Sequence, residues 1–149
     1  MASSSSSSSS GTTNLRELIK STTPILEPEQ FVFAHLLADS SKLPDTFSRM
    51  SELNVKMLFR EREAWTIILP QAVADREGLG YEFPCRQITL NIHSSLDAVG
   101  FIAAIAARLT RLSVGVNCVA AYYHDHLFIP TGREDSVVAE LEAMASEQK

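Results

Sequence analysis

Cysteine is scarce in this sequence, with only Cys85 and Cys118 among 149 residues. Without a C-x-x-C spacing or a histidine pattern beside them, these two thiols indicate neither a disulfide-rich fold nor a zinc site. Such usage favours a reducing compartment, and we expect a cytoplasmic protein. Cys118 lies in an apolar, strand-like run and is expected to be a core residue.

Basic residues and long apolar runs are also few. Lysine and arginine number 13 against 18 acidic residues, giving a net charge of −5, and no basic cluster accumulates, which argues against nucleic acid as a partner. No apolar run approaches the roughly 18 to 20 residues of a membrane helix, so we expect no membrane association. The start lacks the basic and apolar regions of a secretory signal, and its serine run at residues 3–10 predicts a disordered tail over residues 1–13.

The first half of the chain alternates helix-like and strand-like segments. Apolar residues at helical spacing predict a short helix over residues 15–20, which turns at Pro24 and Pro28 bring to an end. Two strand candidates joined by a short charged connection predict a hairpin, and Pro70 opens a helix after it. The predicted strands cover residues 31–37, 55–59 and 65–69, and a linker follows at residues 81–84.

The second half has a clearer pattern. Residues 87–92 alternate polar and apolar side chains, as a strand with one buried face does. Ser94 then predicts the N-cap of a long helix over residues 96–112, with Asp97 completing a variant of the capping box. A hairpin of residues 114–121 and 127–129 and a helix from Arg133 complete the chain.

The second half therefore has the order strand, helix, strand, strand, helix, and an equivalent but blurred order occupies residues from about 30 to 80, where a polar stretch at residues 40–49 stands in the place of the first helix. A duplicated βαββα unit predicts an α+β fold of two tandem ferredoxin-like modules, with antiparallel sheets and helices on one face. We place the modules at residues 14–80 and 86–147. Because an isolated module of about 60 residues buries little surface, the two modules should share a core.

Two blocks of sequence carry a family resemblance. The segments ITLNIHSSLDAVG at residues 88–100 and NCVAAYYHDHLFIP at residues 117–130 resemble small proteins with two ACT modules in tandem, related to the ACT modules of the cytosolic arginine sensor of the TOR pathway. The resemblance implies a ferredoxin-like fold, pairing of modules within or between chains into wider sheets, and amino-acid binding at the module interface. Ala64 and Ala121 depart from the family, which usually has glycine near both positions.

The start of the predicted helix at residues 96–112 is the candidate ligand site. Free backbone N–H groups and the partial positive charge of a helix N-terminus suit a ligand carboxylate, Asp97 suits an ammonium group, and Gly100 allows close approach. Ordinary capping by Ser94 and Asp97 would explain the same residues without a ligand. With the family blocks added, the candidate ligand-binding residues are His93, Ser94, Ser95, Leu96, Asp97, Ala98, Val99, Gly100, Asn117, Val119, His124 and His126.

The expected function is that of a regulatory sensor that binds an amino acid or a similar small metabolite, without a cofactor, as a homodimer or with a partner ACT protein. A first alternative is a dimerisation or protein-interaction module without a small ligand, because the predicted helix at residues 96–112 is apolar on two sides. A second is a metal-dependent enzyme, because His124, Asp125 and His126 are metal-ligating residue types. No nucleophile elbow, phosphate loop or dinucleotide fingerprint is present, so we expect no enzyme.

Overall fold

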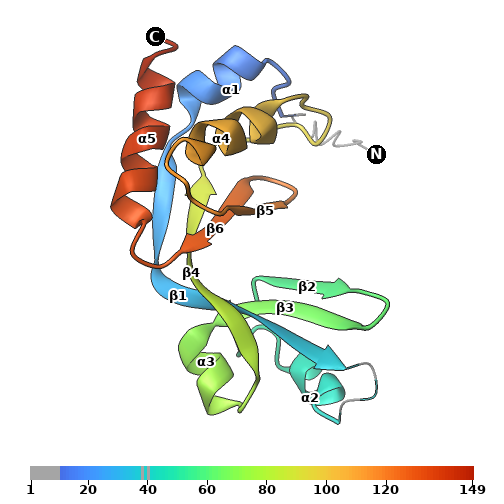
Figure 1. The fold of residues 1–149 in the computed structure, drawn as a ribbon. Coiled ribbons are helices and arrows are strands. Elements are labelled where there is room, and N and C mark those ends of the chain that lie inside the picture. Colours follow the sequence, from blue (N-terminus) through green and yellow to red (C-terminus); the bar gives the residue numbers. More distant parts are fainter. Residues whose placement is uncertain (1–10, 38, 40) are drawn as a thin grey trace, which may run out of the picture.

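The computed structural model describes residues 11–37, 39 and 41–149. In this part of the chain a short first helix precedes two consecutive βαββα units (Figure 1). The elements are α1 (Leu15–Ser21); β1 (Pro24–Leu37), α2 (Leu43–Ser48), β2 (Met57–Arg60), β3 (Ala64–Pro70) and α3 (Gln71–Arg76) of the first unit; and β4 (Tyr81–Leu90), α4 (Phe101–Thr110), β5 (Asn117–Ala120), β6 (Asp125–Pro130) and α5 (Glu134–Ser146) of the second.

The strands form one antiparallel sheet in the order β2-β3-β1-β4-β6-β5. The long central strands β1 and β4 each belong to both halves of this sheet. Residues 31–37 of β1 pair with β3, whereas its residues 24–26 pair only with β4. In the same way, residues 85–90 of β4 pair with β6, whereas Tyr81 and Glu82 pair only with β1. In each unit the sheet therefore contains the unit's own three strands and, as a fourth, the first part of the other unit's central strand.

We use module 1 for α2, α3, β2, β3 and the second half of β1, and module 2 for α4, α5, β5, β6 and the second half of β4. This strand sharing corrects two predictions. Pro24 does not lie in a turn, because it is the first residue of β1. Pro28 lies between Leu26 and Gln30, where the register of β1 against β4 shifts, so its missing N–H interrupts no regular hydrogen-bond ladder. The linker predicted at residues 81–84 is wrong because these residues are the first part of β4.

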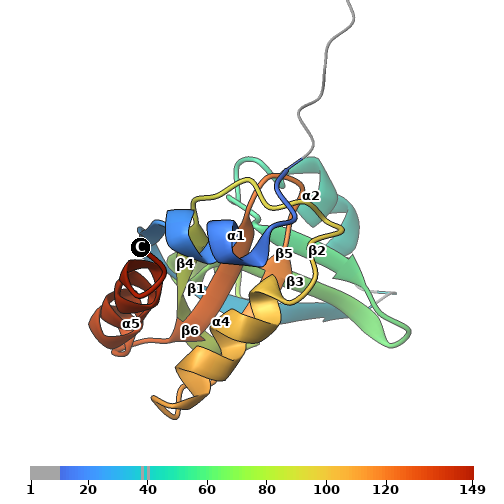
Figure 2. The same cartoon turned by 90° about the horizontal axis from the view of Figure 1, so that it is seen from above.

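The helices cover one face of the sheet, as predicted. Figure 1 shows α1, α4 and α5 at one end of the molecule and α2 and α3 at the other, and Figure 2 shows α1, α4 and α5 lying over the strands. The module 2 core contains Leu18 and Ile19 of α1 together with Phe101 of α4 and Leu141 of α5. The N-terminal helix is thus part of module 2, although it precedes module 1 in the sequence.

On the opposite face of the sheet, which we call the inner face, apolar side chains of the two modules pack against one another. Phe31 and Ile68 of module 1 form a cluster with Cys85 and Phe128 of module 2, and each is at most 2% exposed. The Phe128 ring meets the rings of Phe31 and Phe33 edge to face, with centroids 6.1 and 5.7 Å apart. Because these contacts cross from one half of the sheet to the other, the two modules share a core, as expected for units of this size.

Two smaller expectations are also revised. Residues 1–10 of the predicted disordered tail lie outside the described residues, but Thr12 forms a β-bridge with Ser94, so the last residues of that segment belong to the folded part. Cys118 lies on the edge strand β5 and is exposed rather than a core residue. No helix of the described residues is long and apolar enough to cross a membrane.

Candidate functional site

The candidate site lies in the loop between β4 and α4. The helix predicted from Leu96 begins only at Phe101, and its N-cap is Gly100 at φ 87°. Ser94 does not form the predicted N-cap, because its hydroxyl donates a hydrogen bond of 2.8 Å to the carboxylate of Asp125 in β6. Asp97 forms only a local turn, in which its N–H donates to Ser95 Oγ.

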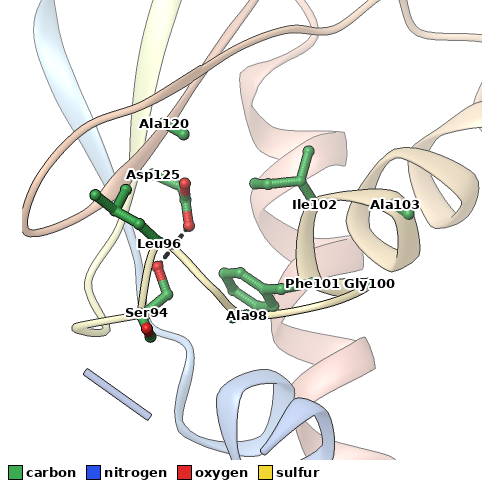
Figure 3. Close-up of a pocket in the computed structure, with 10 residues that line it drawn as sticks. Ser94, Leu96, Ala98, Gly100, Phe101, Ile102, Ala103, Ala120 and Asp125 are labelled. Carbon is green, nitrogen blue, oxygen red and sulfur yellow. Dashed lines mark hydrogen bonds between the residues drawn. The ribbon is translucent and has the colours of Figure 1, made fainter. Parts of the chain in front are cut away.

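This loop, the start of α4 and the hairpin of β5 and β6 border a cavity of about 160 Å³ that is open to solvent on one side (Figure 3). The lining combines two serines and one carboxylate with small and apolar side chains. The lining residues are Ser94, Ser95, Leu96, Ala98, Gly100, Phe101, Ile102, Ala103, Ala120 and Asp125. A small, partly polar compartment thus lies at the helix start, one turn later than predicted.

The two sides of the cavity differ in charge. On one side the backbone N–H groups of Phe101, Ile102 and Ala103 precede the first intrahelical bond, and the N-cap Gly100 has no side chain with which to cap them. On the other side lies Asp125, a residue that is only 6% exposed. Figure 3 shows Asp125 and Ser94 facing each other across from Phe101 and Ile102. The arrangement offers a positive helix end and a negative carboxylate to one small volume.

The structure brings together only part of the predicted site. Ser94, Ser95, Leu96, Ala98 and Gly100 line the cavity. Residues predicted as ligands that do not line it are His93, Asp97, Val99, Asn117, Val119, His124 and His126.

Strand alternation explains part of this division. Asn117 and Val119 pair with Phe128 and His126, so their side chains lie on the inner face of the sheet, whereas the cavity lies on the helix-covered face. The same alternation could have identified Asp125, because it shares a face with the buried Leu127.

The His-Asp-His segment does not form a joint site. His126 Nδ1 lies 3.0 Å from Thr89 Oγ1 and 3.2 Å from Gln87 Nε2 on the inner face. His124 Nδ1 instead lies 3.3 Å from the carbonyl oxygen of Ile92. Burial, assisted by the neighbouring His124, lowers the pKa of His126 below its ordinary value. Among the residues that the structure describes, no group of three or more His, Cys, Asp or Glu side chains could hold a metal ion.

Known proteins share both the sequence pattern and the fold. Two ACT domain family models match the chain, one over residues 10–86 and one over residues 82–143. A Vibrio cholerae protein of unknown function, described as a possible transport protein, is 32% identical with a TM-score of 0.75, and the match covers 88% of this chain and 95% of that one. No curated protein matches the chain.

More distant structures share the fold alone. A protein from Agrobacterium tumefaciens is 13% identical with a TM-score of 0.65, covering 83% of this chain and 89% of that one. The regulatory subunit of aspartate kinase from Thermus flavus is 9% identical with a TM-score of 0.59, covering 83% and 97%. Each of the two βαββα units is matched by an ACT domain family model, and the chain therefore belongs to the ACT domain family.

Proposed function

We propose that this protein is a non-catalytic regulatory sensor that binds a small amino acid in the cavity between the start of α4 and Asp125. Membership of the ACT domain family supports a regulatory role based on small-molecule binding. Amino-acid binding in this cavity is supported by one observation: the buried residue Asp125 faces a helix N-terminus without a side-chain cap across the cavity.

The chemistry of the cavity suits a zwitterion. A ligand carboxylate would accept hydrogen bonds from the N–H groups of Phe101, Ile102 and Ala103, where the helix dipole favours negative charge. The ligand ammonium group would donate to the carboxylate of Asp125, which also accepts a hydrogen bond from the Ser94 hydroxyl. Asp125 thereby takes the role that the sequence had suggested for Asp97.

The size of the cavity favours the smallest amino acids. At about 160 Å³ it is smaller than the roughly 300 Å³ at which most ligand pockets begin. It is similar to an apolar cavity of about 150 Å³ that admits benzene, a molecule of six heavy atoms. Glycine, alanine and serine match this volume, whereas a larger side chain would have to extend out of the cavity beyond Leu96.

Isothermal titration of the full chain against the proteinogenic amino acids tests the proposal. We expect glycine, alanine or serine to bind best, and Asp125→Asn to weaken that binding about tenfold or more, because a hydrogen bond to a charged group is lost. The matched control is Asp97→Asn, which removes one carboxylate from an exposed position of the loop between β4 and α4 and should bind like the wild type. Absence of binding for every amino acid would refute the proposal, and an effect of Asp97→Asn alone would refute the assignment of Asp125.

A second candidate function, a dimerisation module without a small ligand, has one observation in its favour. Leu96, Val99, Tyr122 and Tyr123 are large apolar or aromatic side chains that are at least 62% exposed, in the cavity loop and the neighbouring turn between β5 and β6. By contrast the apolar side chain of Phe101 on α4 is buried in the module 2 core and is not free to contact a partner. Sedimentation analysis of Val99→Asp separates the candidates, since only this alternative predicts a dimer that the substitution dissociates and that ignores amino acids.

A further inference from the structure

The first described residues of the chain lie directly against the wall of the cavity. Thr12 N–H donates to the carbonyl oxygen of His93 at 3.2 Å, and Ser95 N–H donates to the carbonyl oxygen of Thr12 at 3.1 Å. These two bonds form a parallel β-bridge between Thr12 and Ser94. The backbone around Ser94 and Ser95, which line the cavity, is therefore hydrogen-bonded to Thr12 of the N-terminal segment.

Gly11 packs so closely against this wall that there is no room for a side chain. A Cβ atom at position 11 would lie 2.6 Å from the Ser94 carbonyl carbon and the Ser95 nitrogen, and 2.7 Å from the His93 carbonyl oxygen. These neighbours are backbone atoms, so no side chain can rotate away to make room. A larger residue at position 11 must displace the segment or the cavity wall.

A second contact reaches the other end of the cavity loop. Asn14 Oδ1 caps α1 by accepting a hydrogen bond from Glu17 N–H, and the helix then buries Leu18 in the module 2 core. At the start of this helix, Leu15 Cδ2 lies 3.6 Å from the place that a Cβ on Gly100 would occupy. The N-terminal segment thus contacts the loop near residues 93–95 and again near the N-cap of α4.

We propose that residues 11–15 are a positioning strap, which holds the loop at residues 93–95 in its ligand-binding conformation and is in turn held more firmly when the cavity is occupied. The coupling to a ligand rests on the proposed function, but the positioning of the loop does not. Coupling between two such sites is reciprocal, so a ligand that favours the ordered loop favours the docked strap to the same extent. The N-terminus is then the part of the chain whose docking reports amino-acid binding.

Amide hydrogen exchange of the full chain tests the strap without a ligand. Gly11→Val should accelerate exchange of the Ser95 amide on the order of fivefold or more, because its hydrogen-bond acceptor on Thr12 is displaced. The Ile129 amide in β6 should be unchanged. Gly115→Ala is the matched control, since a Cβ there meets nothing within 4 Å. Deletion of residues 2–12 provides a second variant and should give the same acceleration.

Titration of the same variants with glycine, alanine and serine tests the coupling. Gly11→Val should weaken binding on the order of fivefold or more, and saturating amino acid should slow exchange of the wild-type Thr12 amide. Unchanged Ser95 exchange in both Gly11→Val and the deletion would overturn the strap. Faster exchange with unchanged affinity would overturn the coupling. If the wild type binds none of the three amino acids, the proposed function and the coupling both fail, while the exchange data alone decide whether the strap positions the loop.

Discussion

Asp125 of module 2 and Trp65 of module 1 occupy equivalent places in the two halves of the sheet. Asp125 pairs with Ala120 on one side and Leu90 on the other. Trp65 pairs in the same way with Arg60 and Leu36. The two strands also end alike, at Pro130 and Pro70, so the equivalence extends along their length.

The surroundings of these two residues differ in kind. Trp65 packs edge to face against Phe47 of α2, with centroids 5.2 Å apart, and the Arg60 guanidinium lies 5.9 Å from the Trp65 ring centre. Asp125 instead faces a cavity bordered by Ala103 and Ala120. In module 1 large side chains occupy the end of the sheet, whereas in module 2 small ones leave space beside a carboxylate. Duplication of the fold has therefore not duplicated the site chemistry.

The modules also differ in their dependence on the N-terminus, and breaking that dependence should have the largest effect. Leu18 of α1 is 0% exposed within the module 2 core, so Leu18→Ala should lower the free energy of unfolding by about 2 to 5 kcal/mol. Leu15→Ala, on the same helix but 37% exposed, should cost about 1 kcal/mol or less. Urea denaturation followed by circular dichroism measures both. An effect of Leu18→Ala as small as the one expected for Leu15→Ala would contradict the place of α1 in the module 2 core.

A substitution that gives the cavity of module 2 the residue found at the equivalent position of module 1 should impair amino-acid binding. Ala120→Arg places at the cavity the residue that module 1 has at the equivalent position, directly opposite Asp125. The guanidinium should pair with that carboxylate and weaken amino-acid binding about tenfold or more, with little change in thermal stability. Ala107→Arg, at an exposed position of α4 that does not line the cavity, adds the same charge as a control. Calorimetric titration that finds Ala120→Arg unimpaired would contradict the location of the site.

The inner face gives a smaller, pH-dependent contrast. In module 2 His126 pairs with Thr89, whereas in module 1 the histidine and threonine are exchanged, as His35 and Thr66. Because burial lowers the pKa of His126 in the folded state, protonation favours the unfolded state. Stability should therefore fall as the pH drops below about 6.5, the ordinary histidine pKa, and the loss should be complete below the lowered folded-state pKa.

Melting curves between pH 7 and pH 5 measure this contrast. His126→Gln should flatten the pH dependence in that range, and His35→Gln, at an exposed position, should leave it as in the wild type. The carboxylates of Glu52, Glu77 and Glu147 have pKa values lowered by neighbouring arginines, so their contribution is lost only at lower pH. A wild-type slope that survives in His126→Gln would contradict the assignment.

Local sequence patterns predicted the order of elements well, because apolar periodicity is a property of each segment alone. They failed where a distant partner decides the structure. Residues 81–84 read as a linker because their strand character comes from pairing with β1. Helix α4 begins at Phe101 rather than Leu96 because the Ser94 hydroxyl binds Asp125, a residue 31 positions further along the chain.

Local sequence likewise predicts only the part of the candidate site that does not depend on a distant partner. Ser94, Ser95 and Gly100 were found from their local sequence, and they do line the cavity. From its local sequence Asp125 is only a metal-ligating residue type beside two histidines, because its hydrogen bond with Ser94 depends on the pairing of β4 with β6. The N-terminal strap had no local signal, because a serine-rich sequence followed by Gly11 resembles any flexible tail.

An amide NMR titration of the full chain with glycine, alanine and serine locates the bound amino acid directly. The best-binding amino acid should shift the amides of Phe101, Ile102 and Ala103 most strongly, with Ser94 and Ser95 following. In Asp125→Asn the same shifts should saturate only at amino-acid concentrations about tenfold higher or more. Saturable shifts centred on Asn117 and His126 of the inner face, or no shifts with any of the three amino acids, would contradict the proposed site.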